Sequence, residues 1–266
     1  MMNKIARGVV GVALLAGLQS CQTFEKWFGT NDNETAANSV NNEENWNNEY
    51  QNSENPNTTD YSDCGTGNGQ SPIDFTNVTS RAFPNITFNY EDANFSTENT
   101  GNFFQFNTDD AGGFEWNGET YELDYVQFHT PSEHTFDGRH FNAEMQFFHK
   151  NSNGDFAVIS VPFRRGEHNT TFDGYWTNLP AGINETVTNN DTNVNAETFF
   201  PKNRDFFWYE GSFTTPPCND GVQWFVFQNP NTMSSAQVDA FRDVFRNNNR
   251  PVQPTGNRTV WFGTTN

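Results

Sequence analysis

The sequence predicts one mostly β domain that runs from about residue 62 to the C-terminus at residue 266. Within it, runs rich in aromatic and β-branched residues alternate with period two, as half-buried strands do. Turn sequences such as Asn117-Gly118 and Asp137-Gly138 separate the runs, and such pairs favour tight hairpins. The expected strands are residues 103–106, 121–130, 141–149, 156–163 and 222–228.

One segment departs from this alternation. Residues 234–245 place apolar side chains, among them Val238 and Phe241, at helical spacing, and Ser234 precedes them as a capping residue. We therefore expect one amphipathic helix late in the domain. No repeat of solenoid or propeller length is visible, so the elements should form a single domain of about 200 residues.

Residues 1–20 have the features of an export signal. Lys4 and Arg7 precede the apolar run 8–18, which is too short to span a membrane and matches a secretory signal peptide. A buried helix is the alternative. Residues 18–21, Leu-Gln-Ser-Cys, resemble a bacterial lipobox, in which Cys21 becomes the lipidated first residue of the mature chain. This predicts an exported bacterial lipoprotein, located at the outer membrane, at the cell surface or in the periplasm.

Residues 21–61 follow as a membrane-attached tether. They are dominated by Asn, Glu, Thr and Ser and contain few branched aliphatic residues, so they cannot bury enough apolar surface to offset the entropy of ordering. A coil of this length would reach about 35 Å. More than one acyl chain on Cys21 would be needed for durable attachment to the membrane.

The chain is strongly acidic, with a formal net charge of −19. This charge repels polyanions at ordinary salt concentrations, so we expect no nucleic acid partner. Solubility is sufficient to explain the acidic surface.

Export also makes the cysteine count informative. Once Cys21 is assigned to the lipid, Cys64 and Cys218 remain as an even pair in an oxidising compartment. We expect a disulfide between them, with two free thiols as the alternative.

Four separated motifs resemble, in order and spacing, the signature segments of the α-class carbonic anhydrases. They are Gln70-Ser71-Pro72-Ile73-Asp74, Thr130-Pro131-Ser132-Glu133-His134, residues 211–217 (Gly-Ser-Phe-Thr-Thr-Pro-Pro) and Arg250-Pro251-Val252-Gln253-Pro254. The resemblance covers residues 62–263 and implies a twisted, mostly antiparallel sheet of ten strands with few short helices and a conical cleft. The resemblance also implies a disulfide between Cys64 and Cys218, at the positions of the disulfide in bacterial members.

The family's chemistry needs three neutral imidazoles that hold zinc and leave one position open for water. A His-x-His pair on one strand and a histidine on the next strand supply them, and the spacing of two puts the pair on one face. In the register of the motifs, these three positions fall on Gln127, His129 and Gln146. An amide oxygen is a weaker donor to zinc than an imidazole, so the resemblance locates a metal site in which two of the three ligands have been replaced and only His129 is retained.

Other functional positions of the family are retained or changed. Glu133 and Thr214 match the pair that orients the zinc-bound hydroxide, and Glu144 matches the carboxylate that supports a ligand. Asn102 stands where fast members often have a proton-shuttling histidine. The positions that line the carbon dioxide pocket or the cleft wall are Phe148, Val158, Phe213, Thr215, Val222 and Trp224, of which Phe148 replaces a smaller residue.

The remaining histidines do not fall on ligand positions. The resemblance places His134 and His149 in hydrogen bonds within the sheet, and strand parity directs His149 away from Gln146. His140 and His168 lie in polar, turn-like contexts and are expected at the surface. A rebuilt metal site from His129, His134 and a carboxylate is an alternative.

These observations predict a membrane-tethered, carbonic-anhydrase-like protein that has lost the catalytic zinc, holds no cofactor and acts as a binding or scaffold module. Its partners would be an unidentified ligand in the cleft and the membrane at the lipid anchor. The alternatives are a slow carbonic anhydrase that holds zinc in an unusual site, a hydrolase that uses Glu133 and Thr214, and a structural lipoprotein whose cleft binds nothing.

Overall fold

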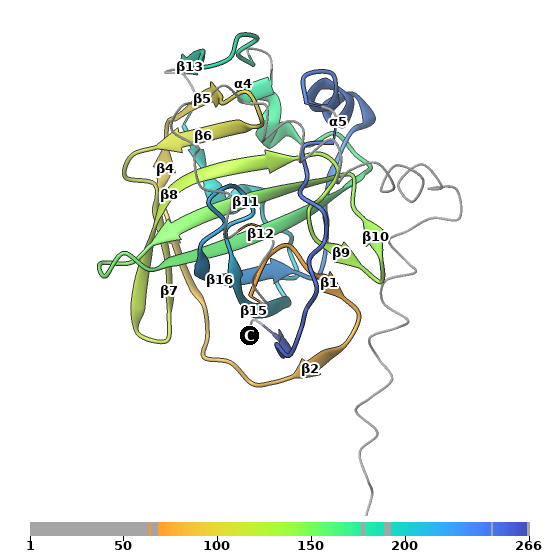
Figure 1. The fold of residues 1–266 in the computed structure, drawn as a ribbon. Coiled ribbons are helices and arrows are strands. Elements are labelled where there is room, and N and C mark those ends of the chain that lie inside the picture. The colour runs from red at the N-terminus through yellow and green to blue at the C-terminus, as the bar shows by residue number, and fades with distance from the viewer. Residues whose placement is uncertain (1–63, 65–68, 177–178, 189–192, 246, 265–266) are drawn as a thin grey trace, which may run out of the picture.

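A large twisted sheet forms the frame of the protein in a computed structural model that describes residues 64, 69–176, 179–188, 193–245 and 247–264 (Figure 1). Ten strands follow one another across it. In spatial order they are β13 (Thr186–Thr188), β5 (Phe95–Asn99), β6 (Phe104–Thr108), β8 (Glu119–His129), β11 (Ala143–Lys150), β12 (Phe156–Arg165), β16 (Asp220–Phe227), β15 (Phe206–Ser212), β18 (Val260–Gly263) and β2 (Val78–Ser80). Within this path only the pairs β12/β16 and β18/β2 are parallel, so the predicted fold class is confirmed.

Shorter elements surround this path. The strands β3 (Thr87–Tyr90), β7 (Gly112–Trp116) and β17 (Asn231–Met233) join the main sheet at its sides. Two small sheets contain β1 (Asp74–Phe75), β9 (Thr135–Phe136), β10 (Arg139–His140), β4 (Asp92–Ala93) and β14 (Val194–Asn195). The described helical segments are η2 (Thr170–Phe172), α4 (Asp173–Trp176), η3 (Ala196–Phe199) and α5 (Ser235–Arg242).

The five strands expected from alternation are present as β6, β8, β11, β12 and β16, and none of their ends differs from the prediction by more than two residues. Both predicted turns are also present. Asn117 and Gly118 have φ of 54° and 84°, and Asp137 and Gly138 have φ of 51° and 72°. Two successive positive φ angles are what a two-residue hairpin of type I′ requires, and Asn, Asp and Gly tolerate them best.

The predicted helix is α5, which begins after the cap Ser234 and ends at Arg242, three residues earlier than expected. The Ser234 hydroxyl accepts the Gln237 amide hydrogen, and the Gln237 side chain accepts that of Ser234, so the first turn is capped in both directions. Phe241 on its buried face packs against Phe128 of β8, with ring centroids 3.8 Å apart. The helix therefore covers the sheet beside the end of β8 (Figure 1).

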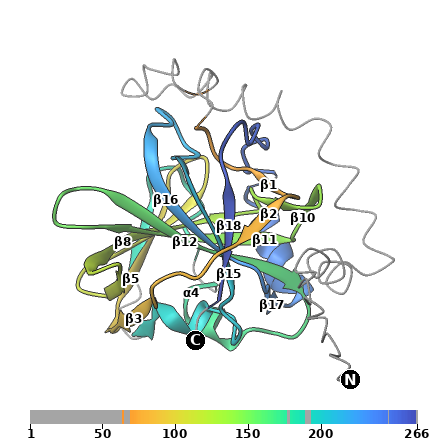
Figure 2. The same cartoon turned by 90° about the horizontal axis from the view of Figure 1, so that it is seen from below.

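Both faces of the sheet are buried at its centre. One face carries an aromatic and aliphatic core that includes Phe128, Met145 and Ile159 from three neighbouring strands. The other face carries a second apolar cluster that includes Phe148 and Trp224. Because side chains alternate along a strand, Gln127, His129 and Gln146 lie on the second face, opposite the larger core. Figure 2 shows the same sheet from below, with the C-terminal strand β18 next to its hydrogen-bonded neighbour β15.

Cys64 and Cys218 form a disulfide, as predicted, with their Cα atoms 5.2 Å apart. The expected signal peptide, the lipidated Cys21 and the tether lie outside the described residues. None of the helices that the structure describes is long and apolar enough to cross a membrane.

The buried His149 predicts how the stability of the protein changes with pH. It is fully buried beside the rings of Phe114 and Tyr90, and the Tyr90 hydroxyl lies 2.6 Å from its Nε2. Burial lowers the pKa of His149 to about 3. The unfolded chain takes up this proton near pH 6.5, so the unfolded state binds more protons between about pH 6.5 and pH 3. Stability should therefore fall as the pH falls through that window.

The variant His149→Gln keeps an acceptor for Tyr90 and cannot titrate, so its stability should depend less on pH between 6.5 and 3. Urea unfolding at several pH values measures this. The exposed His168, substituted in the same way, is the matched control. An unchanged pH dependence in His149→Gln would show that other groups control the acid response.

Candidate functional site

Strand pairing brings the three predicted ligand positions together. Gln127 of β8 lies directly opposite Gln146 of β11, and His129 lies two residues further along β8, opposite Glu144. Residues at paired positions share a face and have neighbouring side chains. All four are buried, with Gln127 3% exposed and Gln146 and His129 fully buried. The sheet therefore brings the three predicted positions together on one face.

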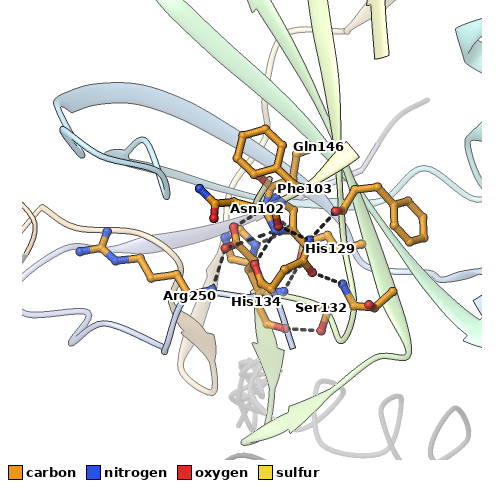
Figure 3. A network of polar contacts seen from close by, with 12 residues as sticks. Asn102, Phe103, His129, Ser132, His134, Gln146 and Arg250 are labelled. Carbon is orange, nitrogen blue, oxygen red and sulfur yellow. Dashed lines mark hydrogen bonds and ion pairs between the residues drawn. The ribbon is translucent and has the colours of Figure 1, made fainter. Parts of the chain in front are cut away.

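The backbone carbonyl of Asn248 orients the ring of His129. Its Nδ1 lies 3.1 Å from the backbone carbonyl of Asn248, and a carbonyl only accepts, so Nδ1 carries the proton. In the neutral ring, the free lone pair is then on Nε2, which is buried and has no hydrogen-bond partner among the described residues. The Asn248 side chain is itself fixed, because it accepts from Thr130 N and donates to the carbonyl of Phe128. Phe103 lies beside the imidazole, with ring centroids 6.1 Å apart (Figure 3).

Gln146 is held by two carboxylates. Its Nε2 donates to Glu133 Oε2 at 2.7 Å and to Glu144 Oε1 at 3.1 Å. Because carboxylates accept and do not donate when ionised, this fixes which end of the amide is the nitrogen. The Gln146 Oε1 is left as a buried acceptor without a partner in the described part of the chain, and Gln127 Oε1 is in the same condition.

Glu144 is the most heavily hydrogen-bonded group of the site. It accepts the backbone amides of Glu133 and His134, the His134 Nδ1 at 2.8 Å and the Ser160 hydroxyl at 2.7 Å. Burial alone would raise the pKa of Glu144, but the adjacent His134 and these hydrogen bonds outweigh it and lower the pKa to about 2. The carboxylate is therefore ionised at neutral pH and accepts a hydrogen bond from the amide of Gln146.

The expected pair of Glu133 and Thr214 is not hydrogen-bonded. Glu133 Oε1 accepts the backbone amide of Arg250 at 2.8 Å, and Oε2 accepts Gln146. The Thr214 hydroxyl is buried and has no partner among the residues that the structure describes. Both retained residues are buried, but no hydrogen bond joins them in the described part of the chain.

Histidines 134, 140 and 168 have hydrogen-bond or ion-pair partners outside the three ligand positions. His134 uses both ring nitrogens, one with Glu144 and one with the Tyr209 hydroxyl at 2.7 Å, so it is not available for a rebuilt metal site. The prediction for His140 was wrong. It is only 7% exposed, and its Nδ1 lies 2.6 Å from the Ser132 carbonyl, because the hairpin of β9 and β10 folds back over the motif. His168 is half-exposed and pairs with Asp173, as expected for the surface.

The predicted pocket residues form one apolar wall. Phe148, Val158, Val222 and Trp224 are fully buried in the second core cluster, and Phe213 packs against it. The Phe148 ring stacks on Tyr125, with centroids 4.6 Å apart, and lies parallel to the Phe213 ring, with centroids 5.9 Å apart. Space for a small apolar substrate beside Val158 and Trp224 is therefore reduced by this stack.

Asn102 and Thr215 lie at the edge of the site. Both are half-buried, and the Asn102 carbonyl accepts from Asn248, the residue that orients His129. An amide side chain at position 102 cannot relay a proton at neutral pH. The Thr215 carbonyl accepts the Cys218 amide hydrogen, which closes the turn that carries Thr214 and the disulfide.

The donors at the three ligand positions do not fit a catalytic zinc ion. They are one imidazole nitrogen and two neutral amide oxygens, one of which belongs to an amide anchored by two carboxylates. Within the described ranges, no group of three His, Cys, Asp or Glu side chains could hold a metal ion instead. A site of this composition lacks the three neutral imidazoles that hold zinc and leave it open to water.

Comparison with known proteins identifies the family of this chain. A model of the eukaryotic-type carbonic anhydrase family matches residues 41–264. The chain belongs to the α-carbonic anhydrase family. The match begins within the range that we assigned to the tether, so residues 41–61 fall inside both ranges.

Relatives with similar sequences and structures support the assignment. The chain is 36% identical over 199 residues to a carbonic anhydrase of Neisseria gonorrhoeae, covering 74% of this chain and 78% of that protein. It resembles the α-carbonic anhydrase of Photobacterium profundum with a TM-score of 0.72 and 32% identity, covering 76% of this chain and 92% of that one. It also resembles dioscorin, solved in complex with ascorbate, with a TM-score of 0.69 and 25% identity, covering 77% and 90%.

Several residues of this α-carbonic anhydrase site were not predicted. Phe103 was assigned only to a strand, and Asn248 and Ser160 had no assigned role, although each contacts a predicted residue. Gln105 was also missed, although it pairs with Gln127 across β6 and β8. Alternation predicts the face of Gln105 within its own strand, but the partner strand and the register follow only from the fold.

Proposed function

We propose that this member of the α-carbonic anhydrase family does not hold the catalytic zinc and acts as a binding or scaffold module. The observation that carries the proposal is the amide of Gln146, which donates to both Glu133 and Glu144. It stands at a ligand position, and the Thr214 hydroxyl has no partner among the described residues. One residue thus replaces a metal ligand and uses both nearby carboxylates as acceptors.

The apolar wall supports the same proposal. Phe148 occupies the position where the family has a smaller residue, and it stacks between Tyr125 and Phe213. A side chain buried in such a stack cannot move aside for a substrate without loss of packing.

Use of this fold for binding has support among the relatives. Dioscorin, which has the same fold, was solved in complex with ascorbate, a small polar organic molecule. This supports ligand binding by a protein of this fold, and we propose that the present chain likewise binds an unidentified small ligand.

We further propose that the domain is attached to a membrane through a lipid on Cys21 and that residues 22–61 separate it from the lipid surface. Cells that express Cys21→Ser should release the protein from the membrane fraction into the soluble fraction. Unchanged membrane association of that variant would exclude the lipid anchor.

The proposal predicts that the purified protein contains no stoichiometric zinc and does not accelerate carbon dioxide hydration. Elemental analysis of the protein, together with a stopped-flow hydration assay, tests both parts on one sample. A catalytically active family member, treated in parallel, is the control for metal loss during purification. Stoichiometric zinc together with carbon dioxide hydration would contradict the proposal.

The second candidate function is a slow carbonic anhydrase with an unusual metal site, or a hydrolase that uses Glu133 and Thr214. It is favoured by the relatives, which are named carbonic anhydrases, and by the His129 Nε2, which is free to bind a metal. Hydration or ester cleavage should then appear on addition of zinc or another divalent ion and disappear with a chelator. No response to any such ion would remove this candidate.

A further inference from the structure

Three glutamines lie side by side across three neighbouring strands on the buried polar face. Gln105 of β6 is the Cα partner of Gln127 of β8, which is the partner of Gln146 of β11. We call these three residues the glutamine row. Paired positions put their side chains within contact of one another on the same face. Loss of two zinc ligands accounts for Gln127 and Gln146 but not for Gln105, which lies outside the ligand positions.

The row presents acceptors. The Gln105 Nε2 donates to Asn107 Oδ1 at 2.7 Å, and the Gln146 Nε2 donates to two carboxylates. Their carbonyl ends are therefore turned away from these partners. The Oε1 atoms of Gln127 and Gln146 are buried and have no partner among the described residues, and the Nε2 of His129, two residues from Gln127 on β8, shares this condition. Buried acceptors without donors are costly, and a ligand that supplies O–H or N–H groups would remove that cost.

The carboxylates behind the row already accept hydrogen bonds from the protein. Glu133 accepts from Arg250 N and Gln146 Nε2, and Glu144 accepts five donors, among them Ser160 Oγ. What remains for a ligand is two amide oxygens and one imidazole. The net charge of −19 on the chain disfavours anions at any of its sites. Together these facts favour an uncharged ligand with several hydrogen-bond donors.

An aromatic surface adjoins the row. Tyr125 lies two residues before Gln127 on the same face of β8 and stacks on Phe148. Tyr125 and Gln105 are both half-buried, so the outer end of the row reaches solvent, whereas Gln127 and Gln146 lie deeper. An amphipathic aromatic ring beside amide groups offers an apolar plane and polar contacts together.

We propose that the glutamine row and Tyr125 form a binding site for a neutral polyhydroxylated ligand, such as a monosaccharide unit. Its hydroxyl groups donate to the amide oxygens of the row, and its C–H face lies on the Tyr125 ring. The inference rests on the proposed function, because it assigns a ligand class to the site that has replaced the zinc ligands.

Isothermal titration of the purified protein with D-glucose, D-galactose, D-mannose and myo-inositol tests the assignment. At least one of these should bind, and Gln127→Leu and Tyr125→Ala should each weaken binding by tenfold or more. Gln105→Leu changes a half-buried residue, so it should fold and weaken the same interaction even where Gln127→Leu does not fold. Gln223→Leu is the matched control, because Gln223 lies on β16, where its side chain contacts Tyr121 rather than the row.

Two results would overturn the inference. One is that none of the four compounds binds, and the other is that binding is unchanged in Gln105→Leu and Tyr125→Ala. Ammonium and methylammonium chloride are titrated in parallel, and binding of these ions without binding of the polyols would assign the acceptors to a cation. The proposed function fails separately, through zinc content and hydration. A zinc-free, inactive protein that binds no polyol would therefore refute only the ligand class.

Discussion

Replacement of Gln127 and Gln146 by histidine together should give the protein tight zinc binding. The two positions face each other across β8 and β11, beside His129, so the double variant has three imidazoles on one face. Changes to residues that only support a metal ligand typically alter affinity about 10 to 100-fold, so two restored ligands should raise it by roughly a thousandfold or more. Equilibrium competition with a chromogenic zinc chelator measures the gain.

The supporting groups for these imidazoles are already in place. Glu144 is ionised and points at position 146, and the Asn248 carbonyl fixes the His129 tautomer. Loss of the Gln146 amide also frees Glu133 Oε2, the oxygen that it occupies now.

Single and control variants separate these contributions. Gln127→His and Gln146→His alone should each bind zinc more weakly than the double variant, and only the second frees Glu133. Gln223→His adds an imidazole elsewhere in the sheet and should leave zinc affinity unchanged. If the double variant binds zinc no better than the native protein, the register across Gln127 and Gln146 is not that of a metal site.

Hydration by the double variant should remain slow even with zinc bound. Phe148 stays stacked between Tyr125 and Phe213 at the substrate side, and Asn102 cannot relay protons. The double variant should therefore regain zinc affinity without regaining fast turnover. The hydration assay on the zinc-loaded double variant checks this.

Loss of the disulfide should cause the largest loss of stability. The bond joins Cys64 to Cys218 over a separation of 154 residues. Removal of a cross-link that closes a loop this long lowers the free energy of unfolding by about 4 to 5 kcal/mol in the chain-entropy model. It also releases the turn in which the Cys218 amide donates to the Thr215 carbonyl, next to Thr214.

The variant Cys64→Ser with Cys218→Ser tests this by urea unfolding, with the linear extrapolation applied to both proteins. Cys21→Ser leaves the pair intact and is the matched control. Equal unfolding midpoints for the double variant and the native protein would mean that the covalent bond adds nothing to stability.

Long strands and the helix were predictable because their signals are local. The alternation of β8 and β11 and the cap at Ser234 are read directly from neighbouring residues. The seven-residue strand β15 was not predicted, and neither were the short strands, since elements such as β1 and β9 contain only two residues each and their pairing joins Asp74 to Thr135. Such pairing depends on contacts between distant segments, which propensity does not encode.

The two histidines in turn-like segments show the same limit of prediction from local sequence. His140 and His168 lie in similar polar sequences, yet the fold buries the first against Ser132 and leaves the second half-exposed. Burial of a turn residue depends on what folds over it, and in this case the hairpin of β9 and β10 packs against the motif that it follows.

By itself the sequence determined the fold, through four motifs in register, and the identity of the residues at the three ligand positions, because both are matters of residue type and spacing. The tertiary structure decided what those residues do. Only the fold shows that Gln146 donates to both Glu133 and Glu144, and that Gln105 extends the row beside Gln127. Hydrogen-bond partners and strand register are set by three-dimensional packing, in which a single amide can engage groups distant in the chain.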